Sequence, residues 1–193
     1  MRYIPALAVV FMLVASSALA GEFEDGQAAY GRCDYATALR IWRSLAEEGN
    51  AEAAYKLGLI YFGGTIVPEN RDEAENWLRA AAQSYRKAAE EGDARAQFSV
   101  GKLYLAGDGV KQDYPEALRW FQKAADQGNV DAIVKLGDMY NFGSGVPKDG
   151  AQALTFYRRA AETGNPEAQD YLAFLLRGDD DVSVGGGAVD LSP

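Results

Sequence analysis

The sequence predicts an all-α fold in which antiparallel helix pairs stack into a solenoid. A Gly-Asn or Gly-Asp pair recurs at intervals of 43, 36 and 36 residues; the four pairs are Gly49-Asn50, Gly92-Asp93, Gly128-Asn129 and Gly164-Asn165. Two apolar patterns with helical spacing lie between successive pairs: an L-G-x-x-Y motif, and an Ala-rich stretch that contains Trp or Phe. A repeat of this length is typical of stacked helical arrays.

The first twenty residues have the pattern of a cleavable signal peptide. Arg2 supplies a positive charge, an apolar run extends from Ile4 to Val14, and Ala18-Leu19-Ala20 is a small-x-small cleavage site. The apolar run is too short to span a bilayer, and no cysteine follows it directly to carry a lipid anchor. We expect cleavage after Ala20 and a periplasmic or secreted protein with no membrane anchor. The alternative is that the segment is retained as an anchor.

The charge of the exported chain argues against nucleic acid or anionic lipid as a partner. Without Arg2, 18 basic residues stand against 28 acidic ones, which gives a net charge of −10. Nucleic acids and anionic membranes attract basic surfaces. The remaining 173 residues suit one domain or one continuous solenoid.

The first helix of each repeat carries the motif A-x-x-x-L-G-x-x-Y, with Val in place of Leu in one copy. Its glycine is Gly58, Gly101 or Gly137. The spacing of the four motif residues places them on one side of a helix. A glycine inside a helix costs about 1 kcal/mol relative to alanine. Its recurrence therefore predicts that a second helix approaches so closely that a Cβ would clash.

The second helix carries A-x-x-W, or A-x-x-F in one copy, followed by further alanines. It opens with an Asn or Asp and, three residues later, an acid or amide, as in a capping box; these openings are Asn70-x-x-Glu73, Asp113-x-x-Glu116 and Asp149-x-x-Gln152. The closing glycine is expected to take the left-handed conformation, and the Asn or Asp after it to cap the next first helix. The joining loops Gly107-Asp108-Gly109-Val110 and Gly143-Ser144-Gly145-Val146 recur with the repeat, which favours a structural turn over phosphate binding.

Partial repeats are expected at both ends of the array. Residues 22–31 and 34–48 resemble a first helix pair, and residues 165–177 repeat the columns of a first helix. The expected repeats are therefore about 22–49, 50–92, 93–128, 129–164 and 165–177, followed by a disordered acidic and Gly-rich tail over 178–193.

One repeat departs from the common pattern. Residues 77–83 and 84–90 read as a seven-residue stretch in tandem copy, which adds about 10 Å of helix. In the loop of the same repeat, Ile66 replaces the second glycine, so this loop should adopt another conformation. Either the longer helix protrudes and shapes a partner site, or the duplication is tolerated and only shifts the superhelix. We favour the second interpretation, because a helix extension that keeps its register is easily absorbed.

These columns resemble the Sel-one-like repeat family, which is related to tetratricopeptide repeats. The resemblance rests on A-x-x-x-L-G-x-x-Y, the G-x-G-V loop, D-x-x-x-A-x-x-W and A-A-x-x-G, and it covers residues from about 27 to 177. It implies a right-handed superhelix of antiparallel helix pairs that acts as a protein-binding adaptor in the cell envelope. The partners it implies are an envelope sensor or a component of secretion or export. Family members proposed to act on cell-wall or β-lactam substrates usually carry paired cysteines in each repeat, which this chain lacks.

The sequence indicates no catalytic residue, no cofactor and no metal ligand. Histidine is absent, which removes the usual general base and most zinc sites. The carboxylates mostly fall at helix caps and on helix surfaces, although their spacing leaves an acid pair for glycoside cleavage open. A cell-wall hydrolase or β-lactam-binding protein is therefore the alternative to a scaffold. Cys33, the only cysteine, excludes an internal disulfide and is interpreted as an inert thiol, with an intermolecular disulfide as the alternative.

The first helices supply the candidate binding surface, because in a stacked array they line the concave side. Positions i, i+3, i+7 and i+10 of each would face inward; these are Glu52, Tyr55, Leu59 and Phe62, then Arg95, Phe98, Lys102 and Leu105, then Asp131, Val134, Asp138 and Asn141. Such a groove suits an amphipathic or extended segment of a partner protein. The alternative is that Tyr55, Phe98 and Val134 simply pack between neighbouring repeats.

Overall fold

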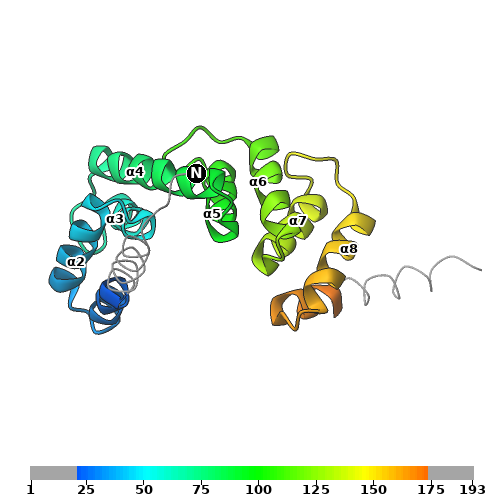
Figure 1. The fold of residues 1–193 in the computed structure, drawn as a ribbon, viewed down its shortest axis with the longest axis horizontal. Helices are drawn as coiled ribbons and strands as arrows, with labels where there is room; N and C mark the ends of the chain where they lie inside the picture. Colours follow the sequence, from blue (N-terminus) through cyan, green and yellow to red (C-terminus); the bar gives the residue numbers. More distant parts are fainter. Residues whose placement is uncertain (1–20, 174–193) are drawn as a thin grey trace, which may run out of the picture. The chain divides into compact units, whose positions relative to one another are not determined.

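The computed structural model describes residues 21–173, and all regular secondary structure in this range is helical (Figure 1). Helices occupy residues 21–31, α2 (Tyr35–Glu47), α3 (Ala51–Gly63), α4 (Arg71–Glu90), α5 (Ala94–Ala106), α6 (Tyr114–Asp126), α7 (Val130–Phe142), α8 (Gly150–Ala161) and residues 166–173. The nine helices of the described range follow one another in sequential pairs, which confirms the predicted all-α fold. The predicted signal peptide (1–20), the end of the last partial repeat (174–177) and the predicted tail (178–193) lie outside the described residues.

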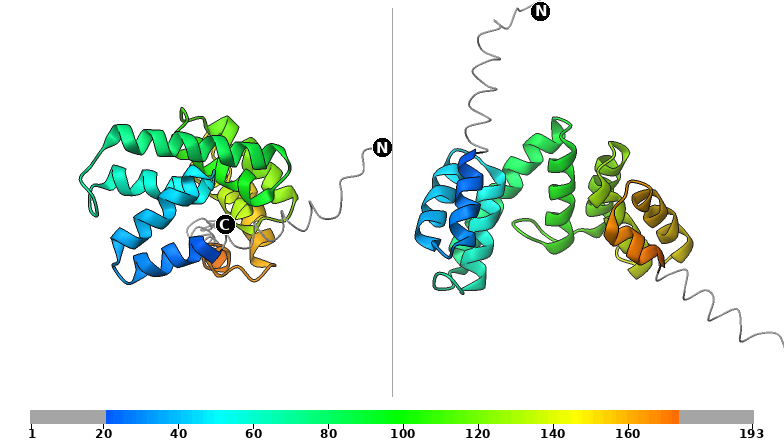
Figure 2. Two further views of the ribbon diagram at one scale, coloured as in Figure 1. Left: turned by 60° about the vertical axis from the view of Figure 1, so that its left-hand side comes forward. Right: turned by 90° about the horizontal axis from the view of Figure 1, so that it is seen from below.

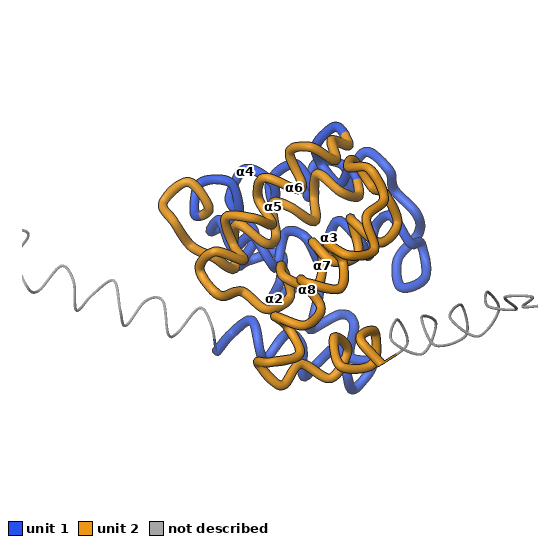
Figure 3. Tube along the Cα trace, turned by 90° about the vertical axis from the view of Figure 1, so that its right-hand side faces the viewer, with its two compact units in different colours: residues 1–88, 107–111 blue, residues 89–106, 112–193 orange. Residues whose placement is uncertain are grey.

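The chain divides into two compact units (Figure 3). Of the described residues, the first contains 21–88 together with the loop 107–111, and the second contains 89–106 and 112–173. Within the second unit, α5 packs on α6, α6 on α7, and α7 on α8 (Figure 2). Contacts inside a helix pair thus alternate with contacts between successive pairs, as expected of a repeat array. The right-handed superhelix stays a prediction.

Asn and Asp side chains cap the helices at the predicted positions. Asn129 accepts a hydrogen bond from the backbone N–H of Ala132 at 2.9 Å. Equivalent bonds start α2 to α6, α8 and the helix at 166–173, from Asp34, Asn50, Asn70, Asp93, Asp113, Asp149 and Asn165. The closing glycines at 49, 92, 128 and 164 have φ between 84° and 102°, the predicted left-handed conformation.

In two of the expected capping boxes, the Glu side chain binds a group other than the backbone N–H of the cap residue. The Glu73 side chain accepts from Trp77 Nε1 at 2.9 Å, and that of Glu116 accepts from Arg119. Both carboxylates thus bind a side chain three or four residues further along the same helix, where indole and guanidinium donors are within reach.

The predicted close approach of the paired helices is confirmed at each motif glycine. A Cβ added to the glycine would meet a bulky side chain of the second helix at 2.6 to 2.7 Å; the pairs are Gly58 with Leu78, Gly101 with Phe121 and Gly137 with Tyr157. In the first pair Gly26 meets Trp42 in the same way. These bulky residues are buried in the cores, so the absent Cβ creates the space into which the second helix packs.

The departures in the second repeat also follow the prediction. α4 has 20 residues, whereas α2 and α6 have 13 each, so the tandem copy extends one continuous helix. In its loop Gly64 has a φ of 63°, but Ile66 does not take a positive φ, whereas Gly109 at the equivalent position has a φ of 67°. The two loops therefore differ in conformation, as β-branching at Ile66 requires.

Candidate functional site: a cavity between α3 and α4

The first unit contains an open cavity of about 350 Å³ between the end of α3, the start of α4 and the loop 107–109. We call it the α3–α4 cavity; it is lined by Leu59, Phe62, Arg71, Ala74, Glu75, Leu78, Gly107, Asp108 and Gly109. Two of the residues predicted to bind a partner, Leu59 and Phe62, lie in it. Its volume is at the small end of ligand pockets, which span roughly 300 to 1,000 Å³.

The wall and floor of the cavity are apolar. Leu59 and Phe62 lie one turn apart on α3, and they remain 42% and 55% exposed. Ala74 and Leu78 lie one turn apart on α4 and are buried beneath them. An exposed aromatic ring beside an apolar floor favours the binding of a further apolar group, because such contact removes both surfaces from water.

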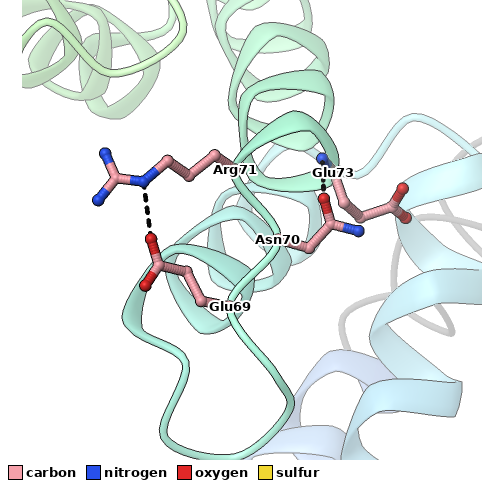
Figure 4. Close-up of polar contacts among 4 residues, drawn as sticks. All are labelled: Glu69, Asn70, Arg71 and Glu73. Atoms are coloured by element: carbon pink, nitrogen blue, oxygen red, sulfur yellow. Dashed lines mark hydrogen bonds and ion pairs between the residues drawn. The ribbon is translucent and has the colours of Figure 1, made fainter.

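The Arg71 cation lies beside the Phe62 ring. The Arg71 guanidinium carbon lies 5.5 Å from the ring centroid, within cation–π range. Its Nε is 2.7 Å from the Glu69 carboxylate, and the adjacent Asn70 caps α4 through the Glu73 N–H (Figure 4). The cap thus positions the start of α4, and the Arg71 guanidinium lies at the cavity edge in an exposed ion pair.

The loop wall carries a carboxylate with a neutral partner. Asp108 Oδ2 accepts a hydrogen bond of 3.1 Å from the Tyr55 hydroxyl. Burial of Tyr55 and the nearby Asp108 charge raise the pKa of the Tyr55 phenol to about 12. The phenol therefore stays protonated at neutral pH and ties the loop to α3 without cancelling the charge of Asp108.

The other predicted binding residues are divided between surface and core. Glu52, Arg95, Lys102 and Asp131 are exposed, while Phe98, Leu105, Asp138 and Asn141 are partly buried. Val134 is 2% exposed within the core of the second unit, and Phe98 packs against the same core. Tyr55 packs against the core of the first unit. For these three residues the structure has the inter-repeat packing that the alternative interpretation describes.

Asp138 has a structural role in the second unit. It accepts hydrogen bonds from the Tyr157 hydroxyl at 2.8 Å and from Lys135 Nζ at 2.7 Å. Burial, and then the hydrogen bond to Asp138, raise the pKa of Tyr157 far above its ordinary value. Tyr157 occupies the place that Phe121 and Leu78 fill in other repeats, so Asp138 satisfies a hydroxyl that would otherwise be buried without a partner.

The described residues contain no group of three or more side chains suited to hold a metal ion. Across the same range, no helix combines the length and apolar character needed to cross a bilayer. Cys33 is exposed in the turn between the first two helices and has a φ of 62°.

Comparison with known proteins places this architecture in a family. The Sel1 repeat model matches residues 51–84, 85–93, 94–129 and 130–165, which is more than half of the chain. The chain belongs to the Sel1 repeat family. Its regular Sel1 repeats are 94–129 and 130–165, and the match breaks inside α4 at residue 84, where the second copy of the tandem stretch begins.

Two solved Sel1-type structures are similar to this chain. A protective antigen of uropathogenic Escherichia coli strains that displays an SLR fold shares 30% identity over 88% of this chain, with a TM-score of 0.50. This chain covers 43% of that antigen, less than half of its length. A Sel1 repeat protein from Oxalobacter formigenes shares 36% identity over 70% of this chain and 96% of its own, with a TM-score of 0.47. No curated protein sequence matches the chain.

The sequence prediction missed the cavity residues that lie outside the first helices of the Sel1 repeats. These are Arg71, Ala74, Glu75 and Leu78 on α4, and Gly107, Asp108 and Gly109 in the next loop. One signal in the sequence pointed to them: the 43-residue interval, against 36 elsewhere, marks the repeat whose neighbours cannot pack in the regular way.

Proposed function

We propose that this Sel1 repeat protein is an exported, non-catalytic scaffold that binds another protein of the cell envelope through the α3–α4 cavity. Sel1 repeats typically mediate protein binding, and the chain belongs to that family. The observation that carries the proposal is that Leu59 and Phe62, both exposed, lie one turn apart beside the apolar floor of a cavity. Envelope sensors and components of secretion or export are the classes of partner to test first.

Export rests on the first twenty residues, whose charge, apolar run and Ala18-Leu19-Ala20 site have the signal-peptide pattern. We expect the protein in the periplasmic or secreted fraction, with Gly21 as its first residue. N-terminal sequencing of the protein recovered from each cell fraction tests this. A membrane-bound chain that still begins at Met1 would contradict export with cleavage.

The binding function is tested by affinity capture from the envelope fraction of cells that make the protein. A Phe62→Glu variant places a charge on the cavity wall and should lose the captured partner. Phe142→Glu is the matched control, because Phe142 is an exposed phenylalanine (68%) on α7 that lies outside the cavity. Lys102→Glu tests whether the surface extends along the first helix of the next repeat.

Two outcomes would count against this function. Capture that survives Phe62→Glu would mean that the cavity is not the binding site. Turnover of muropeptides or of a penicillin probe by the purified protein would mean that the chain is catalytic. Each assay includes the wild type and the Phe142→Glu variant under the same conditions, and circular dichroism of Phe62→Glu detects loss of folded protein separately.

A further inference from the structure

The tandem copy in α4 changes where the next repeat contacts this helix. Between the two regular Sel1 repeats, the loop glycine of the second repeat packs on the first residue of the second helix of the first repeat. A Cβ on Gly145 would clash with Tyr114, which directly follows the cap Asp113. In α4 the equivalent Gly109 approaches the backbone of Leu78, which is eight residues after the cap Asn70.

The contact is thus displaced along α4 by seven residues, which is the length of the tandem copy. Seven residues correspond to about 10 Å of helix, or nearly two turns. The loop 107–109 therefore sits two turns further from the start of α4 than loop 143–145 sits from the start of α6. The first two turns of α4, from Arg71 to Trp77, are left without this covering loop.

The residues exposed by the displacement are those of the cavity. Phe62 is more than half exposed, whereas its equivalent Leu105 is partly buried against the core of the second unit. Arg71, Ala74 and Glu75 belong to the uncovered turns, and Gly107 to Gly109 form the far wall. In the regular repeat, the loop contacts the start of the second helix. Here the loop and the start of α4 are apart, and they form two walls with a space between them.

We propose that the seven-residue duplication opens the α3–α4 cavity as a docking site for a flexible segment of the partner protein. That segment presents a bulky apolar side chain next to a lysine or arginine. The proposal rests on the proposed function and specifies the chemistry of its partner. The apolar side chain is recognised by Leu59, Phe62 and Leu78, and the volume of about 350 Å³ accommodates side chains rather than a folded domain.

The cation in the partner follows from the charges around the cavity. Arg71 pairs with Glu69, and Glu75 pairs with Arg79, so these four charges cancel. The partner of Asp108 is the neutral phenol of Tyr55, which leaves one negative charge on the loop wall. A lysine or arginine in the segment would complement it, and the net charge of −10 of the exported chain favours the approach of a basic segment.

A library of random dodecapeptides displayed on phage, selected against the mature chain (21–193), tests this chemistry. We expect the enriched peptides to combine an aromatic or large aliphatic residue with a neighbouring lysine or arginine. A fluorescein-labelled synthetic copy of an enriched peptide should bind at least tenfold more weakly to Phe62→Ala, while Phe142→Ala binds as the wild type does.

Two further variants test separately the charge of Asp108 and the presence of the cavity. Asp108→Asn keeps an acceptor for the Tyr55 hydroxyl but removes the charge, so binding should weaken severalfold and depend less on salt. Deletion of Ser84–Glu90 returns α4 to the 13 residues of α2 and α6, and it should abolish binding. Circular dichroism establishes whether the deletion variant is folded, and the point variants decide the question if it is not.

Several results would overturn the inference. They are enrichment of acidic peptides, absence of any enriched peptide, unchanged binding by Asp108→Asn, and equal binding by the folded deletion variant. These failures are distinguishable from failure of the scaffold function. If Phe62→Glu abolishes capture from the envelope but the selected peptides are acidic, the scaffold stands and this inference fails. If Phe62→Glu leaves capture intact, the partner binds elsewhere, and the cavity fails as the binding site in both proposals.

Discussion

Replacement of Gly101 by alanine tests whether the motif glycine is required by packing. An added Cβ would lie 2.6 Å from both Cδ1 and Cε1 of Phe121. Carbon atoms pack favourably at about 3.5 to 4.0 Å, so the ring would have to move by about 1 Å. Phe121 is fully buried, and its ring centroid lies 5.7 Å from that of Phe98, so the ring has little space in which to move.

The expected magnitude is a balance of two effects. Overpacking of a core costs about 1 to 3 kcal/mol, whereas alanine gains about 1 kcal/mol over glycine in helix propensity. We expect Gly101→Ala to lower the free energy of unfolding by about 1 kcal/mol. Gly58→Ala should cost less, because the side chain it meets, Leu78, borders the α3–α4 cavity and has room to shift.

Urea unfolding followed by ellipticity and by tryptophan fluorescence measures these differences, and two probes are needed because the two compact units need not unfold together. Gly150→Ala is the control for propensity, since nothing lies within 4 Å of its Cβ position. That variant should be as stable as the wild type or more so. If Gly101→Ala also matches or exceeds the wild type, the glycine column does not reflect close helix packing.

Three further predictions concern single contacts. Asn129→Ala removes the cap of α7 and should cost about 1 kcal/mol in urea unfolding, and no loss would mean that the bond to Ala132 does not stabilise the helix. Tyr55 has a pKa of about 12 in the folded chain against about 10 when unfolded. Its contribution to the free energy of unfolding is therefore complete below pH 10 and falls as the pH rises to 12. Tyr55→Phe should therefore lose less stability than the wild type between pH 9 and 11, and parallel losses would contradict the pKa shift. Cys33 has a φ of 62°, so Cys33→Gly should raise the melting temperature while Cys33→Ser leaves it unchanged, and equal values for both would show no strain at this turn.

The helix pairs could be predicted because their signals are local. An Asn such as Asn129 and a glycine such as Gly128 determine a boundary through bonds and dihedral angles within a few residues. Helical spacing carries less information about the surroundings of a side chain. Val134 and Phe62 both belong to the predicted stripe, yet Val134 is buried between helices and Phe62 is exposed in the cavity. Which of the two occurs depends on how neighbouring repeats pack, and this is not encoded in the spacing.

The cavity was beyond the prediction for a related reason. Its walls come from α3, α4 and the loop 107–109, which begins 29 residues after Leu78, and they meet because the contact of that loop is displaced along α4. The sequence predicted the longer helix and favoured a shift of the array. What it did not predict is that a shift along one helix leaves the first two turns of that helix uncovered.

The length of the tandem copy explains why this displacement leaves the core intact. Successive residues turn by about 100° around a helix, so seven residues fall about 20° short of two full turns. Ala82 and Ala89, which occupy the same place in the two copies, are accordingly both buried, at 6% and 2% exposure. An insertion of six or eight residues would rotate the second copy by about 100° relative to this arrangement and expose one of the two alanines. A seven-residue insertion moves the next contact along α4 with almost no rotation, and such a movement opens a space between repeats while keeping both apolar faces buried.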